Sequence, residues 1–239
     1  MAGRVLVICN QKGGVGKTTS AVNLGWGLSR GGVRVLVMDL DSQANATAGL
    51  GVSREGLGAY ALAVGENAER EIVRAGEGLE VLPGGTLMGR VGWGEEERIG
   101  AAIGRLSRSR DFVIADCPPS VSAVMMGALR AAGEVVVPVE CEYYAMEGVA
   151  KMLGLVESVR NDARVHLAAT MFKDEVELHR EVLEELRGHL GELLLDTVVP
   201  WDAALAEAPS HGESVFDYAP RSRGAYAYAM LTKEVRSRG

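Results

Sequence analysis

The chain has 239 residues, a length typical of one α/β domain, and 47% of its residues are hydrophobic while 24% are charged. This composition excludes disorder over most of the chain, and the apolar runs are much shorter than the ~20 residues of a membrane-spanning helix. The formal net charge of −7 argues against a surface built throughout for nucleic acid, although not against a local basic patch. Because Cys9, Cys117 and Cys141 lack metal-ligand spacing and cannot form a disulfide framework, we expect a cytoplasmic protein.

Short, near-continuous apolar runs alternate along the chain with segments of helical periodicity, such as those around 18–30, 149–159 and 178–190. The alternation predicts an α/β fold, namely a doubly wound, mostly parallel sheet flanked by helices, with its ligand outside the carboxyl ends of the strands. We expect a single domain over residues 1–239, without an N-terminal helix-turn-helix. The predicted strands are Arg4–Cys9, Arg34–Asp39, Leu79–Leu82, Phe112–Asp116, Glu134–Val139, Val165–Met171 and Leu193–Val199.

A glycine-rich segment, Asn10–Thr19, joins the first predicted strand to the first predicted helix. Its glycines allow backbone amides to converge on phosphate oxygens, and the helix N-terminus adds its dipole. Lys17 supplies a charge for the β- and γ-phosphates, and the Thr18 hydroxyl suits Mg²⁺. The alternative, a glycine-rich turn with an incidental lysine, is disfavoured by the strand before it and the helix after it. The predicted nucleotide-binding residues here are Lys12, Gly13, Gly14, Val15, Gly16, Lys17, Thr18 and Thr19.

This segment departs from the general pattern G-x-x-x-x-G-K-[ST] in one informative way. Gln11 stands in the place of the first glycine, and a second lysine, Lys12, follows at once. K-G-G-x-G-K-T is the deviant Walker A form of the P-loop, and the segment resembles the ParA/MinD ATPases, more closely the ParA (Soj-like) partition proteins. Two lysines five positions apart do not easily serve one phosphate from the same side. The resemblance implies that Lys12 reaches across a dimer to the partner's nucleotide.

Further segments carry the same resemblance, which runs from about Arg4 to Val235. The switch-like sequence at 39–47 is similar to D-L-D-P-Q-x-N-A-T, with Ser42 in place of the proline, and 111–120 resembles a Walker B strand and second switch. The sequences E-Y-Y-A-M-E-G at 142–148 and E-A-P-S-H-G at 207–212 are also close to family signatures.

Three aspartates follow or end predicted strands. Asp116 ends an apolar strand, and we expect it to act beside Thr18 on the magnesium side of the site; the alternative is a strand-end cap. Asp39 and Asp41 are expected on one face by strand alternation. The resemblance implies that Asp41 orients the attacking water while Asp39 supports the site; the alternative for Asp41 is a loop cap. The predicted catalytic residues are Lys12, Lys17 and Asp41.

No guanine-recognition motif N-K-x-D is present, so ATP is favoured over GTP. The resemblance implies that the adenine lies near Met171 and Pro200, although the family has Pro-Arg-Asn where this chain has Pro200-Trp201-Asp202.

The resemblance implies a slow, partner-stimulated Mg²⁺-dependent ATPase. ATP closes a sandwich homodimer, hydrolysis opens it, and the cycle acts in chromosome or plasmid partition with a ParB-like centromere-binding protein. The alternatives are a MinD-like ATPase on a membrane and another cargo-positioning ATPase. A membrane role needs an amphipathic C-terminal helix with a broad apolar face, and residues 232–239 are too polar, so we expect no membrane partner.

Non-specific DNA binding and nucleoid association are part of the same resemblance, but the expected surface arginines are replaced by Glu175, Trp201 and Ala204. Binding through that surface should therefore be weak. Basic residues gather near the end of the chain instead, where a merely solvated charged face is an equally good interpretation. The candidate DNA-binding residues are Arg221, Arg223, Lys233, Arg236 and Arg238.

Overall fold

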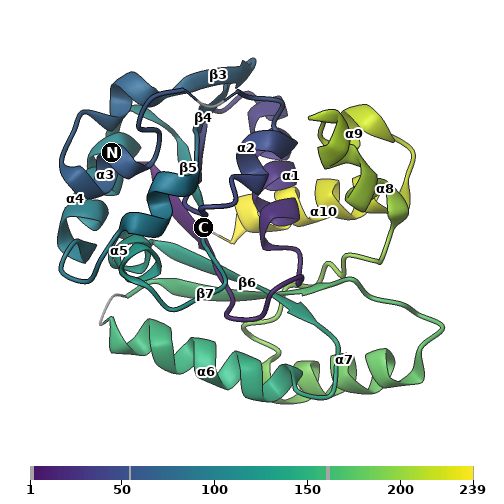
Figure 1. The fold of residues 1–239 in the computed structure, drawn as a ribbon. Helices are drawn as coiled ribbons and strands as arrows, with labels where there is room; N and C mark the ends of the chain where they lie inside the picture. Colours follow the sequence, from purple (N-terminus) through teal and green to yellow (C-terminus); the bar gives the residue numbers. More distant parts are fainter. Residues whose placement is uncertain (1–2, 54, 160–161, 239) are drawn as a thin grey trace.

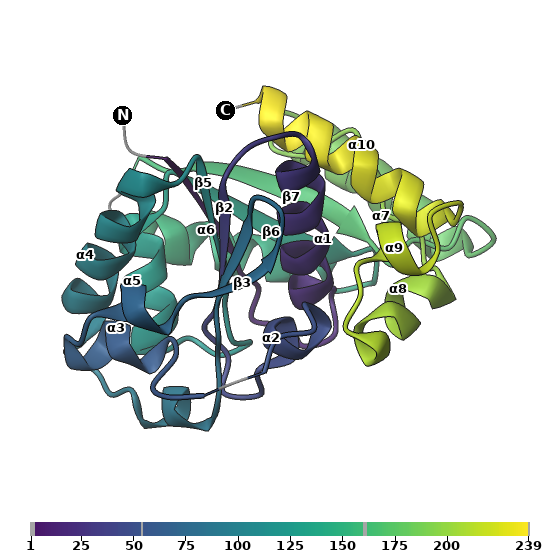
Figure 2. The ribbon, with the colours of Figure 1, turned by 90° about the horizontal axis from the view of Figure 1, so that it is seen from above.

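In the computed structural model, which describes residues 3–53, 55–159 and 162–238, a seven-stranded sheet lies between two layers of helices (Figures 1 and 2). The first strand shows why. Val5, Val7 and Cys9 pack in one hydrophobic cluster, whereas Leu6 and Ile8 pack in the other. Because side chains alternate along a strand, an unbroken apolar run must have both faces covered.

The strand order is β3-β4-β2-β5-β1-β6-β7, and every neighbouring pair is parallel except β3 with β4. The predicted doubly wound, mostly parallel sheet is confirmed. The antiparallel edge strand β3 was missed because it is short and its Val73 is exposed, which leaves no apolar run. The strands are β1 (Arg4–Ile8), β2 (Val35–Asp39), β3 (Val73–Gly76), β4 (Leu79–Leu82), β5 (Phe112–Asp116), β6 (Glu134–Glu140) and β7 (Arg164–Thr170).

The predicted strand Leu193–Val199 is wrong. This segment runs beside β7 but forms only the isolated bridges Leu167–Leu194 and Phe172–Pro200. Between the bridges, the backbone N–H groups of Asp196 and Thr197 donate to the carboxylate of Glu234, at 2.7 and 3.0 Å. These donors are therefore diverted from the sheet, and the ladder cannot continue.

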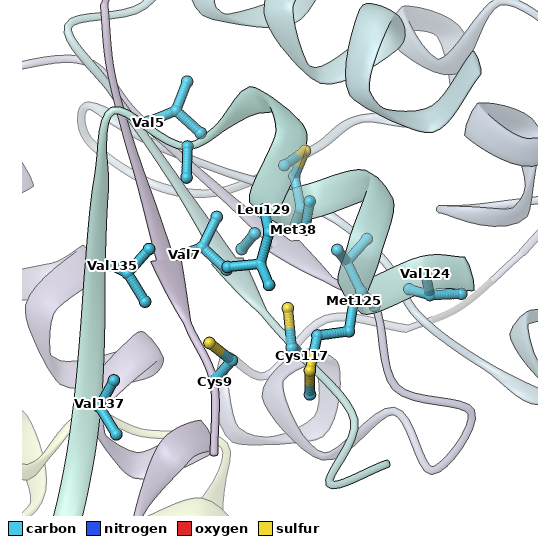
Figure 3. Close-up of a cluster of buried hydrophobic side chains, with 14 of the residues drawn as sticks. Val5, Val7, Cys9, Met38, Cys117, Val124, Met125, Leu129, Val135 and Val137 are labelled. Atoms are coloured by element: carbon cyan, nitrogen blue, oxygen red, sulfur yellow. The ribbon is translucent and has the colours of Figure 1, made fainter. Parts of the chain in front are cut away.

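One helical layer, built on α4, α5, α6 and α7, packs against the face that carries Val5 and Val7, and α1 with α10 covers the other face. Figure 3 shows the first of these clusters, with Met125 and Leu129 of α5 directed toward β1. No helix in the described ranges is both long and apolar enough to cross a bilayer. The α-helices are α1 (Lys17–Arg30), α2 (Asn45–Gly49), α3 (Tyr60–Val64), α4 (Glu96–Leu106), α5 (Ala123–Ala131), α6 (Ala145–Ser158), α7 (Glu177–Leu190), α8 (Ala203–Glu207), α9 (Val215–Tyr218) and α10 (Arg223–Ser237).

The strand register gathers the polar strand ends at one edge of the sheet. Asp116 of β5 pairs with Ile8 of β1 on one side and with Asp39 of β2 on the other. The segment after β1 therefore begins at the same level as both carboxylates. The parallel topology brings together residues that are more than 70 positions apart in the chain (Asp39 and Asp116).

The opposite edge of the sheet holds the C-terminal helix in place. Arg4 donates to both carboxylate oxygens of buried Glu134, at 2.6 and 2.8 Å, and to the carbonyls of Val235 and Arg236 at the end of α10, at 2.7 and 3.0 Å. His166 Nε2 lies 3.2 Å from the same carboxylate. Burial alone would raise the pKa of Glu134, but the His166 and Arg4 contacts outweigh it and lower the pKa to about 2.

We predict that Glu134→Gln destabilises the fold by about 2 kcal/mol at neutral pH, because the buried Arg4 contact loses its counter-charge. Since the pKa of this carboxyl is depressed, its stabilisation is present above the ordinary value of 4.5 and is lost as the pH falls toward 2. Urea unfolding at several pH values measures the difference. Glu192→Gln, at an exposed turn residue, is the control. A penalty that does not change between pH 7 and pH 3 would show that packing, not charge, holds α10.

Candidate nucleotide-binding site

The glycine-rich loop lies between β1 and α1 and is tied to two neighbouring strands. Gly14 and Gly16 have φ values of +80° and +84°, which glycine adopts without the steric cost of a Cβ. Asn10 Nδ2 donates to the Pro138 carbonyl of β6 at 2.8 Å, and Thr170 Oγ1 of β7 donates to the Val15 carbonyl at 2.9 Å. The loop is therefore held in a curled shape from its beginning and its end.

Lys17 lies within this loop and is only 8% exposed. Its Nζ donates to the carbonyl of Lys12 at 2.7 Å. Burial lowers the pKa of Lys17, while the nearby carboxylates of Asp116 and Asp41 oppose that shift. An ammonium has three donors. Its position inside the loop and its bond to a backbone carbonyl suit a group that binds an anion arriving at the loop.

Thr18 and Asp116 meet at the start of α1, as the sequence predicted. Thr18 Oγ1 donates to Asp116 Oδ2 at 2.8 Å, and the other carboxylate oxygen, Oδ1, is buried without a hydrogen-bond partner in the described structure. Burial, helped by the charge of Asp39, raises the pKa of Asp116 to about 8. A hydroxyl beside an unpartnered carboxylate oxygen is a donor set that suits a hard divalent cation. These residues fit Mg²⁺, which Thr18 and Asp116 would hold, directly or through water.

Asp39 supports the switch-like segment from inside. This buried carboxylate accepts hydrogen bonds from the N–H and the hydroxyl of Thr47, both at 2.7 Å, and from the N–H of Asp41 at 3.1 Å. Burial raises the pKa of Asp39, and these three hydrogen bonds oppose the shift. Gly84 approaches so closely that a Cβ there would lie 2.5 Å from Asp39 Oδ1.

Asp41 is half-buried and lies beyond the end of β2, so strand alternation does not place it on the face of Asp39 as expected. Its Oδ1 accepts from the N–H of Gln43 at 3.0 Å, which is the loop-cap geometry. Ala44, next in the segment, has a φ of +56°, a left-handed conformation that costs a non-glycine residue about 1 kcal/mol. A strained, capped turn is suited to changing shape when a ligand binds. The role of Asp41 in orienting water stays a prediction.

A small hollow of about 90 Å³ adjoins Gly16 and Thr19, and both residues predicted near adenine, Met171 and Pro200, line it. Sequence reasoning missed Leu205 of α8 and Tyr228 of α10, which carry no local signal because tertiary packing brings them here. The remaining lining residues are Thr170, Val199, Trp201, Asp202 and Ala206.

Asp202, where the resemblance expects asparagine, has a structural use. Its Oδ1 caps α8 by accepting from the N–H of Ala204 at 3.0 Å, and its Oδ2 accepts from the N–H of Gly224 at 2.7 Å. The carboxylate thereby joins two helices that border the hollow.

Lys12 and Lys17 lie in different surroundings, in agreement with the expectation that they do not serve one phosphate from the same side. Lys12 Nζ pairs with Glu140, the last residue of β6, at 2.9 Å and with Glu142 just beyond the strand, and its side chain is 45% exposed. The acidic pair was not identified from the sequence, because it lies some 130 positions away from Lys12.

The candidate DNA-binding residues fall into two groups. Arg221 and Arg223 line a hollow of about 1020 Å³ between α7 and α10. Arg236 and Arg238 lie about 20 Å beyond Arg223 along the direction of α10. There Arg236 donates to the Gly31 carbonyl at 3.4 Å, and Arg238 pairs with Asp196 and Glu234. Exposed Lys233 belongs to this second group. The five residues do not form one surface on a single chain.

Comparisons with known proteins agree with this geometry. Residues 3–169 match a family described as an AAA domain. The chromosome-partitioning ATPase Soj of Thermus thermophilus is 44% identical over 245 residues, which cover 98% of this chain and 96% of that protein. Among solved structures, the cell division ATPase MinD of Pyrococcus furiosus has a TM-score of 0.86 and 26% identity, covering 99% of this chain and 100% of that one.

Cobyrinic acid a,c-diamide synthase of Mycobacterium smegmatis, solved with a bound ATP analogue and magnesium, has a TM-score of 0.81 and 28% identity, and covers 98% of this chain and 94% of that one. The solved structures share the fold, whereas the relatives that bear the names Soj and ParA also share at least a third of the residues over nearly the whole chain. The protein therefore belongs to the Soj/ParA family of partition ATPases, within the P-loop AAA domain family.

Proposed function

We propose that this protein is a Mg²⁺-dependent ATPase switch that acts in chromosome or plasmid partition. The observation that carries the proposal is the juxtaposition of Lys17, Thr18 and Asp116 at one loop, where one carboxylate oxygen of Asp116 is buried without a hydrogen-bond partner among the described residues. Membership of the Soj/ParA family supports ATP as the nucleotide and partition as the process.

The residues divide the chemistry among them. Backbone N–H groups at residues 13–18 and the Lys17 ammonium bind the β- and γ-phosphates. Thr18 and Asp116 hold the magnesium ion, which neutralises charge on the phosphates when bound. Asp41 orients water toward the γ-phosphate, while Asp39 holds the segment that carries Asp41. Phosphoryl transfer needs little covalent chemistry from the protein, so positioning of the reactants and stabilisation of charge account for the rate of ATP hydrolysis.

The active form we propose is an ATP-dependent homodimer in which Lys12 reaches the partner's nucleotide. Tyr143 and Tyr144, at the start of α6, are 76% and 71% exposed and lie at the same edge of the sheet as Lys12. Exposed aromatic side chains are enriched at protein interfaces. A ParB-like partner would stimulate hydrolysis by completing or ordering this face.

A MinD-like role at a membrane is the second candidate, because the MinD structure shares the fold. The apolar side of α10 is already used, since Tyr228, Leu231 and Val235 are buried against α1 and the sheet. The rest of the helix exposes Tyr226 and Met230 together with the cationic Lys233 and Arg236, which is too mixed a surface for a broad apolar face. The geometry therefore favours partition over membrane positioning.

DNA would be contacted through Arg221 and Arg223 rather than through the distal group. Arg236 and Arg238 already have partners in the chain. The hollow beside Arg221 and Arg223 holds two further arginines and three acidic residues, so its charge is mixed with a small excess of arginine; the further residues are Arg180, Arg187, Asp174, Glu184 and Asp196. Dimerisation would bring together the arginines of two chains, and DNA binding at the nucleoid would then depend on ATP.

Lys17→Ala should abolish Mg²⁺-ATP binding, because the phosphates lose the one ammonium inside the loop. Calorimetric titration with a slowly hydrolysed ATP analogue measures the loss. The matched variant is Lys12→Ala, which should retain nucleotide binding by the monomer. Tight binding by Lys17→Ala would refute the assignment of the loop.

Asp41→Ala should bind ATP, hydrolyse it at least about 10²-fold more slowly, and accumulate as a dimer in size-exclusion runs. Asp41→Asn separates the two roles, because its amide oxygen keeps the cap on Gln43 while the charge is lost. If Asp41 only caps the loop, Asp41→Asn is as active as the unmodified chain. A variant that stays monomeric with ATP while the unmodified chain dimerises would assign Asp41 to assembly.

Arg221→Glu/Arg223→Glu should weaken ATP-dependent binding to non-specific duplex DNA by at least tenfold, because contacts to phosphates release counterions. Arg236→Glu/Arg238→Glu carries the same change of charge and should have a smaller effect. Mobility-shift titrations with ATP at two salt concentrations compare the three proteins. Equal loss in both variants would point to net charge, and no binding by the unmodified chain would exclude a direct DNA contact.

A further inference from the structure

Lys12 is paired within its own chain although the proposed function requires it in another. Its ammonium is paired with Glu140, the last residue of β6, and with Glu142 in the turn that follows. The backbone is tied to the same place, because Asn10 accepts from the Lys12 N–H at 3.0 Å and donates to the Pro138 carbonyl of β6. The side chain and the backbone N–H of Lys12 are therefore held beside β6, whereas its carbonyl accepts from Lys17 Nζ inside the loop.

In this contact one ammonium faces two carboxylates, so the cluster keeps a net negative charge. Partial burial would lower the pKa of Lys12, but the hydrogen bonds to Glu142 and Glu140 outweigh it and raise the pKa. The Lys12 hydrogen bond in turn lowers the pKa of Glu142. One ammonium shared between two carboxylates has no spare positive charge for a phosphate. It must exchange these partners before it binds one.

The exchange is feasible because the contact lies at the surface. The side chains of Lys12, Glu140 and Glu142 are 45%, 21% and 49% exposed. Exposed ion pairs contribute little free energy and are screened by salt. A polyphosphate, which carries more charge at one point than a carboxylate, competes well for the same ammonium.

We propose that Glu140 and Glu142 are positioning residues that hold Lys12 in a resting place on its own chain, and that this contact opens when two ATP-bound copies associate. The inference rests on the proposed function, since it takes the second copy's nucleotide as the new partner of Lys12. Only copies in which Lys12 has left Glu140 and Glu142 can associate. The contact therefore raises the dissociation constant of the dimer by a factor set by the ratio of closed to open copies in the monomer. Each dimer must open two such contacts.

The test is Glu140→Gln/Glu142→Gln, which keeps both side-chain volumes and removes both charges. The dissociation constant of the dimer, measured by sedimentation with the slowly hydrolysed ATP analogue, should fall by about four- to twenty-fivefold, since each of the two resting contacts contributes a factor of about two to five. The affinity of the monomer for Mg²⁺-ADP should not change, and the urea unfolding midpoint should fall by no more than the loss of one such exposed contact allows.

The matched control is Glu157→Gln/Glu177→Gln, which makes the same change of net charge at exposed positions on α6 and α7. The dependence of the dimer dissociation constant on salt provides a second test, because a purely structural role of Glu140 and Glu142 would not make the effect of the variant depend on salt. The advantage of the test variant over the unmodified chain should shrink as NaCl rises from about 0.05 to about 0.5 M, because salt opens the contact in the unmodified chain.

The outcomes separate the inference from the function on which it rests. If the unmodified chain dimerises with ATP and the test variant dimerises equally or less well, the resting contact is refuted while the switch stands. Equal tightening by the control variant would likewise refute it in favour of net charge. Failure of the unmodified chain to dimerise at any salt concentration would overturn the proposed function, and the inference with it.

Discussion

The structure depends on burying ionisable groups where β1, β2 and β5 end. Lys17, Asp39 and Asp116 are all nearly inaccessible to solvent, and the strand register places the two carboxylates in neighbouring strands. Burying a charge costs free energy unless it is paired and hydrogen-bonded. Asp39 is fully satisfied, but Asp116 has one oxygen without a partner and a pKa of about 8. The unpartnered Asp116 oxygen beside the Thr18 hydroxyl is the group at this edge that a bound cation would satisfy.

The same carboxylates connect the site to the segments around it. Asp39 contacts Thr47 in α2, and the Thr47 hydroxyl in turn accepts from the N–H of Gly84, beyond β4, at 2.9 Å. The turn at 41–44, α2 and the segment after β4 are therefore linked through hydrogen bonds that lead to the one buried carboxylate of Asp39. On the other side, Asp202 joins α8 to α10 beside the hollow that contains Met171. Occupation of this edge by a nucleotide would act on elements far apart in the sequence.

The sequence predicted the sheet, the loop and the Thr18–Asp116 contact because each has a local signature. An apolar run marks a buried strand, three glycines mark the loop, and a carboxylate at a strand end marks the edge of a parallel sheet. It could not predict that Glu234 of α10 diverts the N–H groups of Asp196 and Thr197, which converts an expected strand into two isolated bridges. The contributions of Tyr228 and Leu205 to the hollow were hidden for the same reason, since they arise from tertiary contacts. The edge strand β3 was hidden for a different reason, because a short strand with an exposed valine leaves no apolar run.

The two lysines of the loop show how far one short segment can separate two functions. They are five residues apart, yet Lys17 is 8% exposed inside the loop and the Lys12 side chain is 45% exposed outside it. Gly14 and Gly16 make the separation possible, because their left-handed backbone curls the chain between the lysines. In the function proposed above, a lysine inside the loop would serve the chain's own nucleotide. A lysine outside it, paired with Glu140 and Glu142, would leave these carboxylates only when another molecule brings a stronger anion close. The acidic pair would then make the proposed dimer conditional on bound nucleotide, since a partner without phosphates offers Lys12 nothing better than the carboxylates it already has.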